Sequence, residues 1–224
     1  MTKNWWKLLA SGLVIYSIIG GLLFEVPHLP ILHESIRNVY FHVPMWFTMI
    51  FLYLISVIYS IKYLRSGNES YDFWAVEAIN TGIVFGFLGV LTGMIWANFT
   101  WGDPWPNDPK LNGAAISTLM YLAYGVLRNS LDEDQKRARI SAIYNVFAFP
   151  VMIVLLFILP RLTDSLHPGN GGNPGFGGYD LDSHMRVVFY PACIGWILIG
   201  IWITTLRYRI RLIENNKLHT LTRN

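Results

Sequence analysis

The stretch WANFTWGDPWPNDPKLN, from Trp96 to Asn112, separates two long apolar runs and carries three tryptophans beside three prolines and two aspartates. Proline lacks a backbone N–H and fixes φ, so the stretch is predicted to follow an extended or turning path, with its tryptophans on a loop. Tryptophan also collects at membrane–water interfaces, and for Trp96 alone we favour that interpretation. For the cluster we favour a flat aromatic platform for a large apolar ligand.

The composition places this loop in a membrane protein. Of the 224 residues, 53% are hydrophobic and 14% are charged, against about 25% charged residues in a typical soluble domain. Six charge-free runs are long enough to cross about 30 Å of hydrocarbon. They are Leu8–Phe24, Val43–Ile61, Ala78–Phe99, Leu111–Leu127, Ile140–Pro160 and Val187–Leu206. We predict an all-α, polytopic membrane protein in which residues 1–224 form a single domain, a bundle of six transmembrane helices.

The distribution of basic residues predicts the orientation of the bundle. With six spans, 13 of the 17 lysines and arginines fall on the side of the chain ends and 4 on the other side. Lysine and arginine are retained in the cytoplasm, so both termini are expected to be cytoplasmic. The loops 25–42, 98–110 and 161–186 would then face the periplasm from a bacterial inner membrane. The net charge of +3 is a topology signal and does not indicate nucleic-acid binding.

Other features are assigned to packing or to connections. Gly82, Gly86, Gly89 and Gly93 share one helical face and predict close helix packing. Pro150 is expected to kink its span. The charged run Arg128–Arg139 is interpreted as a solvated turn. The first run is interpreted as a retained anchor, since no small-residue cleavage site follows it.

Motifs for covalent haem attachment and for nucleotide binding are missing from the sequence. Cys193, the only cysteine, is interpreted as a small packing residue, and no Cys-x-x-Cys-His motif is present for covalent haem attachment. The stretch Pro168–Gly178 is glycine-rich and could be either a mobile flap or a flexible linker. It fits no nucleotide-binding pattern, so ATP hydrolysis by this chain is excluded.

Five of the six histidines lie in or beside the two outer loops that flank the tryptophan loop. One such histidine is usually an ordinary polar residue. Two that face each other across an aromatic platform would suit haem, because neutral imidazole is a common axial ligand of haem iron. His42 precedes Pro44, which suits a first helical turn, so His42 is expected at a helix mouth. Arg37 and Lys110 could pair with the haem propionates, although Lys110 could also be a snorkelling lysine.

Three motifs resemble the cytochrome c biogenesis protein CcmC family. They are RNVYFHVP at Arg37–Pro44, Trp101-Gly102 with Trp105 and Asp108–Leu111, which resembles the family's tryptophan-rich WWD domain, and Ser165-Leu166-His167. The chain departs from the family pattern at three positions. Asn107 precedes Asp108, Lys110 stands where the family has arginine, and Pro104 replaces an aromatic residue.

The resemblance implies roles for particular residues and partners. His42 and His167 would be the axial ligands of the haem iron. Trp101, Trp105 and Asp108 would belong to the haem-handling surface, with Arg37 and Lys110 at its basic positions. We add Trp96 to these candidate cofactor-binding residues. The family presents haem to the periplasmic chaperone CcmE and works with the ATP-driven transporter CcmA/CcmB and the small subunit CcmD.

The sequence therefore predicts an assembly factor for c-type cytochrome maturation that holds non-covalent haem b transiently and has no conventional enzyme activity. The alternative is a bis-histidine b-type cytochrome that transfers electrons. Such a protein buries haem between its spans, whereas none of the six runs contains a histidine. An ion or solute transporter would need ionisable groups inside the spans, and the runs contain none.

Overall fold

The computed structural model describes residues 4–28, 32–167 and 181–221, and these residues form helices joined by short connections. The long helices are α1 (Trp5–Leu23), α2 (Val39–Ser66), α3 (Glu69–Trp101), α4 (Pro109–Asn129), α5 (Asp134–Ile153) and α8 (Ser183–Leu221). A 3₁₀-helix, η1 (His33–Asn38), leads into α2. A π-helical segment, η2 (Val154–Ile158), and the short α6 (Leu159–Leu162) extend α5.

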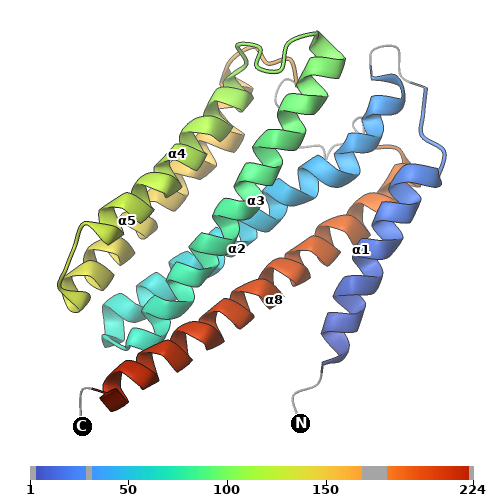
Figure 1. Ribbon diagram of the computed structural model, residues 1–224. Coiled ribbons are helices and arrows are strands. Elements are labelled where there is room, and N and C mark those ends of the chain that lie inside the picture. The colour runs from blue at the N-terminus through green and yellow to red at the C-terminus, as the bar shows by residue number, and fades with distance from the viewer. Residues whose placement is uncertain (1–3, 29–31, 168–180, 222–224) are drawn as a thin grey trace.

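Five of these segments are long and apolar enough to cross a membrane, which confirms a multi-pass, all-α protein. The expected span Leu111–Leu127 does form a helix, α4, but α4 is not among the five. Polar residues such as Asn112, Ser117 and Thr118 dilute its apolar character. The start of α1 and the end of α8 nevertheless lie at the same end of the bundle (Figure 1).

Helix α2 runs through the middle of the bundle and contacts α3, α8 and α5. A first core lies between α2, α3, α4 and α5 and includes Met49, Tyr53, Tyr121 and Met152, all at most 1% exposed. A second core joins the start of α2 to the start of α8. Large apolar side chains such as Phe147, 70% exposed, point outward, as expected for helices that face lipid.

The glycine face of α3 sets the register between α2 and α3, as the sequence predicted. Tyr53 lies against Gly82, Met49 against Gly86, Trp46 against Gly89 and His42 against Gly93. A Cβ atom at Gly82 would lie 2.4 Å from the Tyr53 ring, closer than side chains approach one another. The missing side chains therefore let the two helices approach closely along their whole contact.

Several connections differ from the prediction. Helix α3 continues to Trp101 and ends at Gly102, whose φ of 79° is the left-handed conformation that commonly terminates a helix. The connection to α4 is therefore 102–108, shorter than the expected 98–110. Helix α2 begins at Val39, so Pro44 lies in its second turn and not its first. The π-helical segment begins four residues after Pro150, and such segments are common sites of helix bending.

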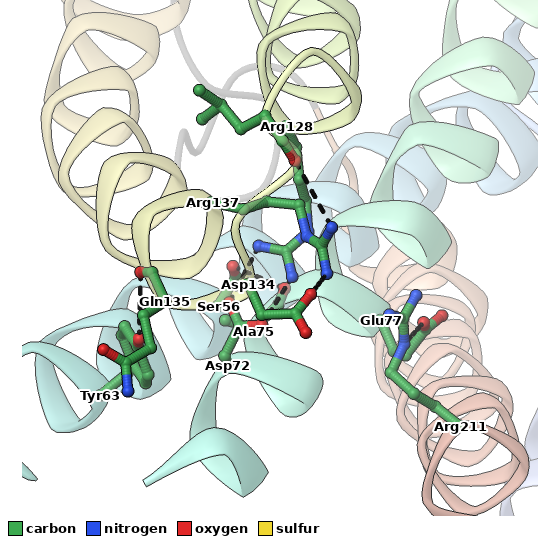
Figure 2. Close-up of polar contacts among 11 residues, drawn as sticks. Ser56, Tyr63, Asp72, Ala75, Glu77, Arg128, Asp134, Gln135, Arg137 and Arg211 are labelled. Atoms are coloured by element: carbon green, nitrogen blue, oxygen red, sulfur yellow. Dashed lines mark hydrogen bonds and ion pairs between the residues drawn. The ribbon is translucent and has the colours of Figure 1, made fainter. Parts of the chain in front are cut away.

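The structure contains ion pairs that were not predicted. They lie at the end of the bundle that holds the start of α1 and the end of α8. Their residues lie outside the charge-free runs, in parts of the helices that extend beyond those runs. Asp72 on α3 accepts two hydrogen bonds from Arg128 on α4, at 2.9 and 2.6 Å, and both side chains are less than 10% exposed (Figure 2). Glu77 on α3 pairs with Arg207 and Arg211 of α8 at 2.7 and 2.6 Å. The prediction of a solvated turn is thus wrong for Arg128.

Candidate functional site

A cavity of about 350 Å³ lies at the end of the bundle opposite to these ion pairs. It is enclosed by η1, the first half of α2, the last half of α3, the connection 102–108 and the start of α4, with η2 and His167 completing the wall. The wall is apolar and rich in tryptophan, apart from the polar side chains of His42, Thr100, Lys110 and His167. Its size is within the range of small-molecule and cofactor sites. A hollow of about 530 Å³ at the other end of the bundle is lined by charged side chains without any histidine.

His42 enters the cavity wall from the first turn of α2. Its Nδ1 atom lies 3.1 Å from the hydroxyl oxygen of Thr92 on α3. The ring packs on Gly93, where a Cβ atom would lie only 2.7 Å from the ring carbon Cε1. The rings of Trp46 and Trp96 stand edge-on to the imidazole, with centroids 6.3 and 5.8 Å away. Residues of both helices therefore fix the orientation of His42.

His167 reaches the same cavity from the segment after α6, and Asp108 holds it there. The His167 Nδ1 atom lies 3.1 Å from Oδ1 of Asp108, and the His167 ring stands edge-on to Trp101 at 5.4 Å. The other carboxylate oxygen of Asp108 accepts hydrogen bonds from the Ser165 hydroxyl at 2.8 Å and the Leu166 backbone N–H at 2.7 Å. One buried carboxylate thus organises the whole segment.

Asp108 also begins α4. Its Oδ1 atom accepts hydrogen bonds from the backbone N–H groups of Lys110 and Leu111, with Pro109 in the first helical position. Burial raises the pKa of Asp108, but hydrogen bonds from His167, Leu166 and Ser165 and the charge of His167 outweigh it and hold that pKa well below its usual range. Asp108 is therefore a carboxylate at neutral pH, although it is only 1% exposed.

The tryptophans do not all lie on a loop, contrary to the prediction. Trp96 and Trp101 belong to α3, because the first proline comes only at position 104, and Trp105 alone lies in the connection. All three still line the cavity. Trp96 donates from Nε1 to the Ser35 hydroxyl at 3.3 Å and faces His42, so it is not merely part of an interfacial belt.

The two candidate basic residues occupy different places. Lys110 lines the same cavity as Trp105. Arg37 is not among the described residues that line the cavity. Its guanidinium group donates hydrogen bonds to the carbonyls of Gly21 and Phe24 at the end of α1 and to the carboxylate of Glu34. Within the described part of the chain, Arg37 therefore ties η1 to α1.

Two residues of the site were not anticipated, Thr92 and Trp46. Trp46 follows His42 by four residues, and residues at this spacing share a helical face. Thr92 is adjacent to Gly93 at the end of the glycine face. The side chains on α2 that pack on this face have the same spacing as the glycines, namely His42, Trp46, Met49 and Tyr53. Comparing the two spacings in the sequence could therefore have revealed both residues.

Two of the membrane-spanning helices contain a histidine, contrary to the prediction. His42 is the fourth residue of α2, and His184 is the second residue of α8. The helices extend further than the apolar runs, since polar residues in a helix end still form backbone hydrogen bonds. The glycine-rich stretch Pro168–Gly178 lies outside the described residues, and its expected role is untested.

The donor set of the cavity fits haem. The carboxylate of Asp108 can only accept a hydrogen bond, so Nδ1 of His167 carries a hydrogen both in the charged ring and in the neutral ring that could bind a metal. Its Nε2 atom then keeps a lone pair for a metal. His42 offers a second imidazole in the same wall, and the tryptophans supply flat apolar surface for a macrocycle.

Comparisons with known proteins show which sequences this chain is similar to. The family model described as "CcmC: Heme exporter protein C" matches residues 1–223. The chain is similar to Heme exporter protein C of Bradyrhizobium diazoefficiens, with 24% identity over 216 residues that cover 92% of this chain and 81% of that protein. It is also similar to Cytochrome c biogenesis protein CcsA of Pelargonium hortorum, with 33% identity over 113 residues. That match covers 50% of this chain and 35% of CcsA, so the chain spans only about a third of that relative.

Proposed function

Because the chain belongs to the heme exporter protein C (CcmC) family, we propose that it is a haem-handling assembly factor of c-type cytochrome maturation. It binds haem b non-covalently between His42 and His167 and delivers it to the periplasmic chaperone CcmE. The observation that carries this proposal is the presence of two imidazoles in the wall of one tryptophan-lined cavity.

Each part of the wall has a role in the proposed binding. His42 and His167 would hold the haem through their Nε2 atoms, and the haem would supply an iron centre that accepts such donors. Trp96, Trp101 and Trp105 cover the macrocycle with apolar surface and exclude water. Lys110 is placed to pair with a propionate, and its ammonium group suits a carboxylate. Asp108 orients His167, and we assign no direct haem contact to Arg37.

The proposed partners follow from the family. CcmE would receive haem from the cavity, and CcmA/CcmB and CcmD would complete the assembly in the bacterial inner membrane. The start of α2, the end of α3 and the connection 102–108 line the cavity, and they lie at the end of the bundle opposite to the start of α1 and the end of α8 (Figure 1). Most basic residues are assigned to the end of the bundle that holds the start of α1 and the end of α8. Together with this distribution, the arrangement supports cytoplasmic termini and a periplasmic site.

The test of ligation is the absorption spectrum of purified protein. Acid-acetone should extract the pigment, since no covalent attachment motif exists. His42→Ala and His167→Ala should each alter the haem spectrum, and added imidazole should restore bound haem by filling the vacated position. The exposed His28 and His33 are matched controls whose alanine variants should keep the wild-type spectrum. A wild-type protein that stays colourless with haem supplied would refute the proposal.

The tryptophans should respond differently to the same treatment. Trp101→Ala and Trp105→Ala remove contact area but no iron ligand, so the remaining haem should keep its bis-histidine spectrum. Haem occupancy or transfer to CcmE should fall, and imidazole should not restore it. Recovery of occupancy with imidazole would show that these rings act through iron coordination.

The orientation is tested by reporter fusions. Fusions after Lys136 and at the C-terminus should report cytoplasm, and a fusion within 169–178 should report periplasm. A periplasmic C-terminus would put the cavity on the cytoplasmic side and would contradict delivery to a periplasmic chaperone.

The alternative, an electron-transferring b-type cytochrome, is compatible with the same two ligands. The experiment that separates the two functions is reduction by quinol, compared with transfer of haem to CcmE. Transfer of intact haem to CcmE supports the assembly factor, and rapid quinol oxidation without transfer supports the cytochrome.

A further inference from the structure

The Thr92 hydroxyl determines which nitrogen of His42 carries the hydrogen. Its Oγ1 atom lies 2.7 Å from the Leu88 carbonyl and 3.2 Å from the Gly89 carbonyl, and both of these groups can only accept. A hydroxyl has one hydrogen, and here that hydrogen is donated to a carbonyl. Toward His42, 3.1 Å away, the Thr92 oxygen therefore offers a lone pair. Nδ1 of His42 carries the hydrogen, and Nε2 keeps the lone pair for a metal.

The two imidazoles are held by unequal partners. Nδ1 of His167 donates to the buried carboxylate of Asp108, whereas the partners of the His42 ring are neutral: the Thr92 hydroxyl and the backbone carbonyl of Gly89. A hydrogen bond to a carboxylate is charge-assisted, and it makes the opposite ring nitrogen a stronger donor to a metal. A neutral hydroxyl that is already donating to a carbonyl gives much less of this effect.

We propose that Thr92 is a positioning residue that supports His42 as a haem ligand less strongly than Asp108 supports His167, so that His42 is the exchangeable ligand and His167 the retained one. This inference rests on the proposed haem function. In the exchange, the bond between iron and His42 Nε2 breaks and the electron pair returns to Nε2. An incoming donor forms the new bond with its own pair, so the iron is neither oxidised nor reduced. Release of haem toward a partner would thus begin on the α2 side of the cavity.

The test uses cyanide as the incoming donor, because a cyanide-bound haem absorbs differently from a bis-histidine haem. Purified haem-loaded protein is titrated with potassium cyanide at one fixed pH, and the half-saturating concentration is measured. Thr92→Val removes the hydroxyl at nearly constant shape and should lower that concentration by about tenfold, the lower end of typical effects of outer partners of metal ligands. Thr92→Ser restores a hydroxyl and should stay within about twofold of the wild type.

Thr81→Val is the matched control. Thr81 lies on the same helix and donates to the carbonyl four residues earlier at 2.8 Å, as Thr92 does, but none of its hydrogen bonds within the described part of the chain involves a histidine. Its variant should titrate like the wild type. In the His42→Ala background the ligand that Thr92 holds is absent, so adding Thr92→Val should cause no further change. If Thr92→Val yields no haem-loaded protein, Thr92→Ala removes the same hydroxyl without adding an atom and supplies the comparison.

Three results would overturn the inference: equal titrations of Thr92→Val and wild type, a serine variant that behaves like valine, or a Thr92 effect that persists without His42. Each of these requires a wild type that holds haem, so the proposed function would survive them. A wild type that binds no haem would refute the proposed function itself.

Discussion

Gly93→Ala should weaken haem binding while leaving the bundle folded. The added Cβ atom would lie 2.7 Å from Cε1 of His42, and ordinary contacts begin at 3.4 Å, so the ring must move by about 0.7 Å. A catalytic or binding group tolerates a displacement of roughly 0.5 Å before its geometry is lost. The imidazole of the variant is therefore too far displaced to ligate as in the wild type.

The size of the effect follows from the cost of overpacking, about 1–3 kcal/mol. Without haem the His42 ring can rotate away from the new methyl group, whereas iron ligation fixes the ring, so the cost falls mainly on the haem-bound state. Since about 1.4 kcal/mol corresponds to tenfold in affinity, we expect binding weaker by about 5- to 150-fold. The assay is a haem titration of apoprotein in detergent, followed by the absorption band of ligated haem.

The matched control is Gly125→Ala on α4, where a Cβ atom meets nothing within 4 Å in the described part of the chain. That variant should bind haem normally and gain about 0.5–1 kcal/mol of helix stability. In the His42→Ala background, added imidazole replaces the missing ligand and is not attached to the chain, so it can move away from a new methyl group. Gly93→Ala should therefore lower the haem affinity of that variant only slightly. Haem binding by Gly93→Ala that equals that of Gly125→Ala would contradict the prediction. So would a loss of affinity that is as large without His42 as with it.

Two further predictions concern buried carboxylates. Asp108→Asn keeps an N-cap for α4 but loses the charge that holds His167. Haem affinity in the same titration should therefore fall by about 10- to 100-fold, with little loss of thermal stability. An unchanged affinity would contradict the role assigned to Asp108. Asp72→Ala leaves Arg128 buried without its partner and should cost about 3–5 kcal/mol of folding stability, measured by thermal unfolding in detergent. Asp134→Ala, which breaks a pair whose acid is 80% exposed, should cost at most about 1 kcal/mol, and equal losses in the two variants would show that burial is not what matters.

Local sequence determined the helical segments and the two helix ends that border the tryptophan-lined cavity. The charge-free runs predicted the helical segments, because a chain in hydrocarbon must satisfy its backbone hydrogen bonds internally. Gly102 and Asp108 end α3 and begin α4 through conformations and hydrogen bonds that depend on immediate neighbours. The glycine face of α3 predicted close packing, since only a side without Cβ atoms permits it. The motifs around His42, Trp105 and His167 were enough to indicate the family, which the comparison confirms.

Tertiary structure decided which residues meet. The partners in Thr92–His42 and Asp108–His167 are 50 and 59 residues apart, and Asp72 and Arg128 are 56 apart. No local pattern relates such positions, because their contact depends on the rotation and depth of each helix in the bundle. Those quantities are fixed by many weak packing contacts acting together. The sequence therefore indicated two candidate ligands, and only the packed bundle showed that each is held by a different kind of partner.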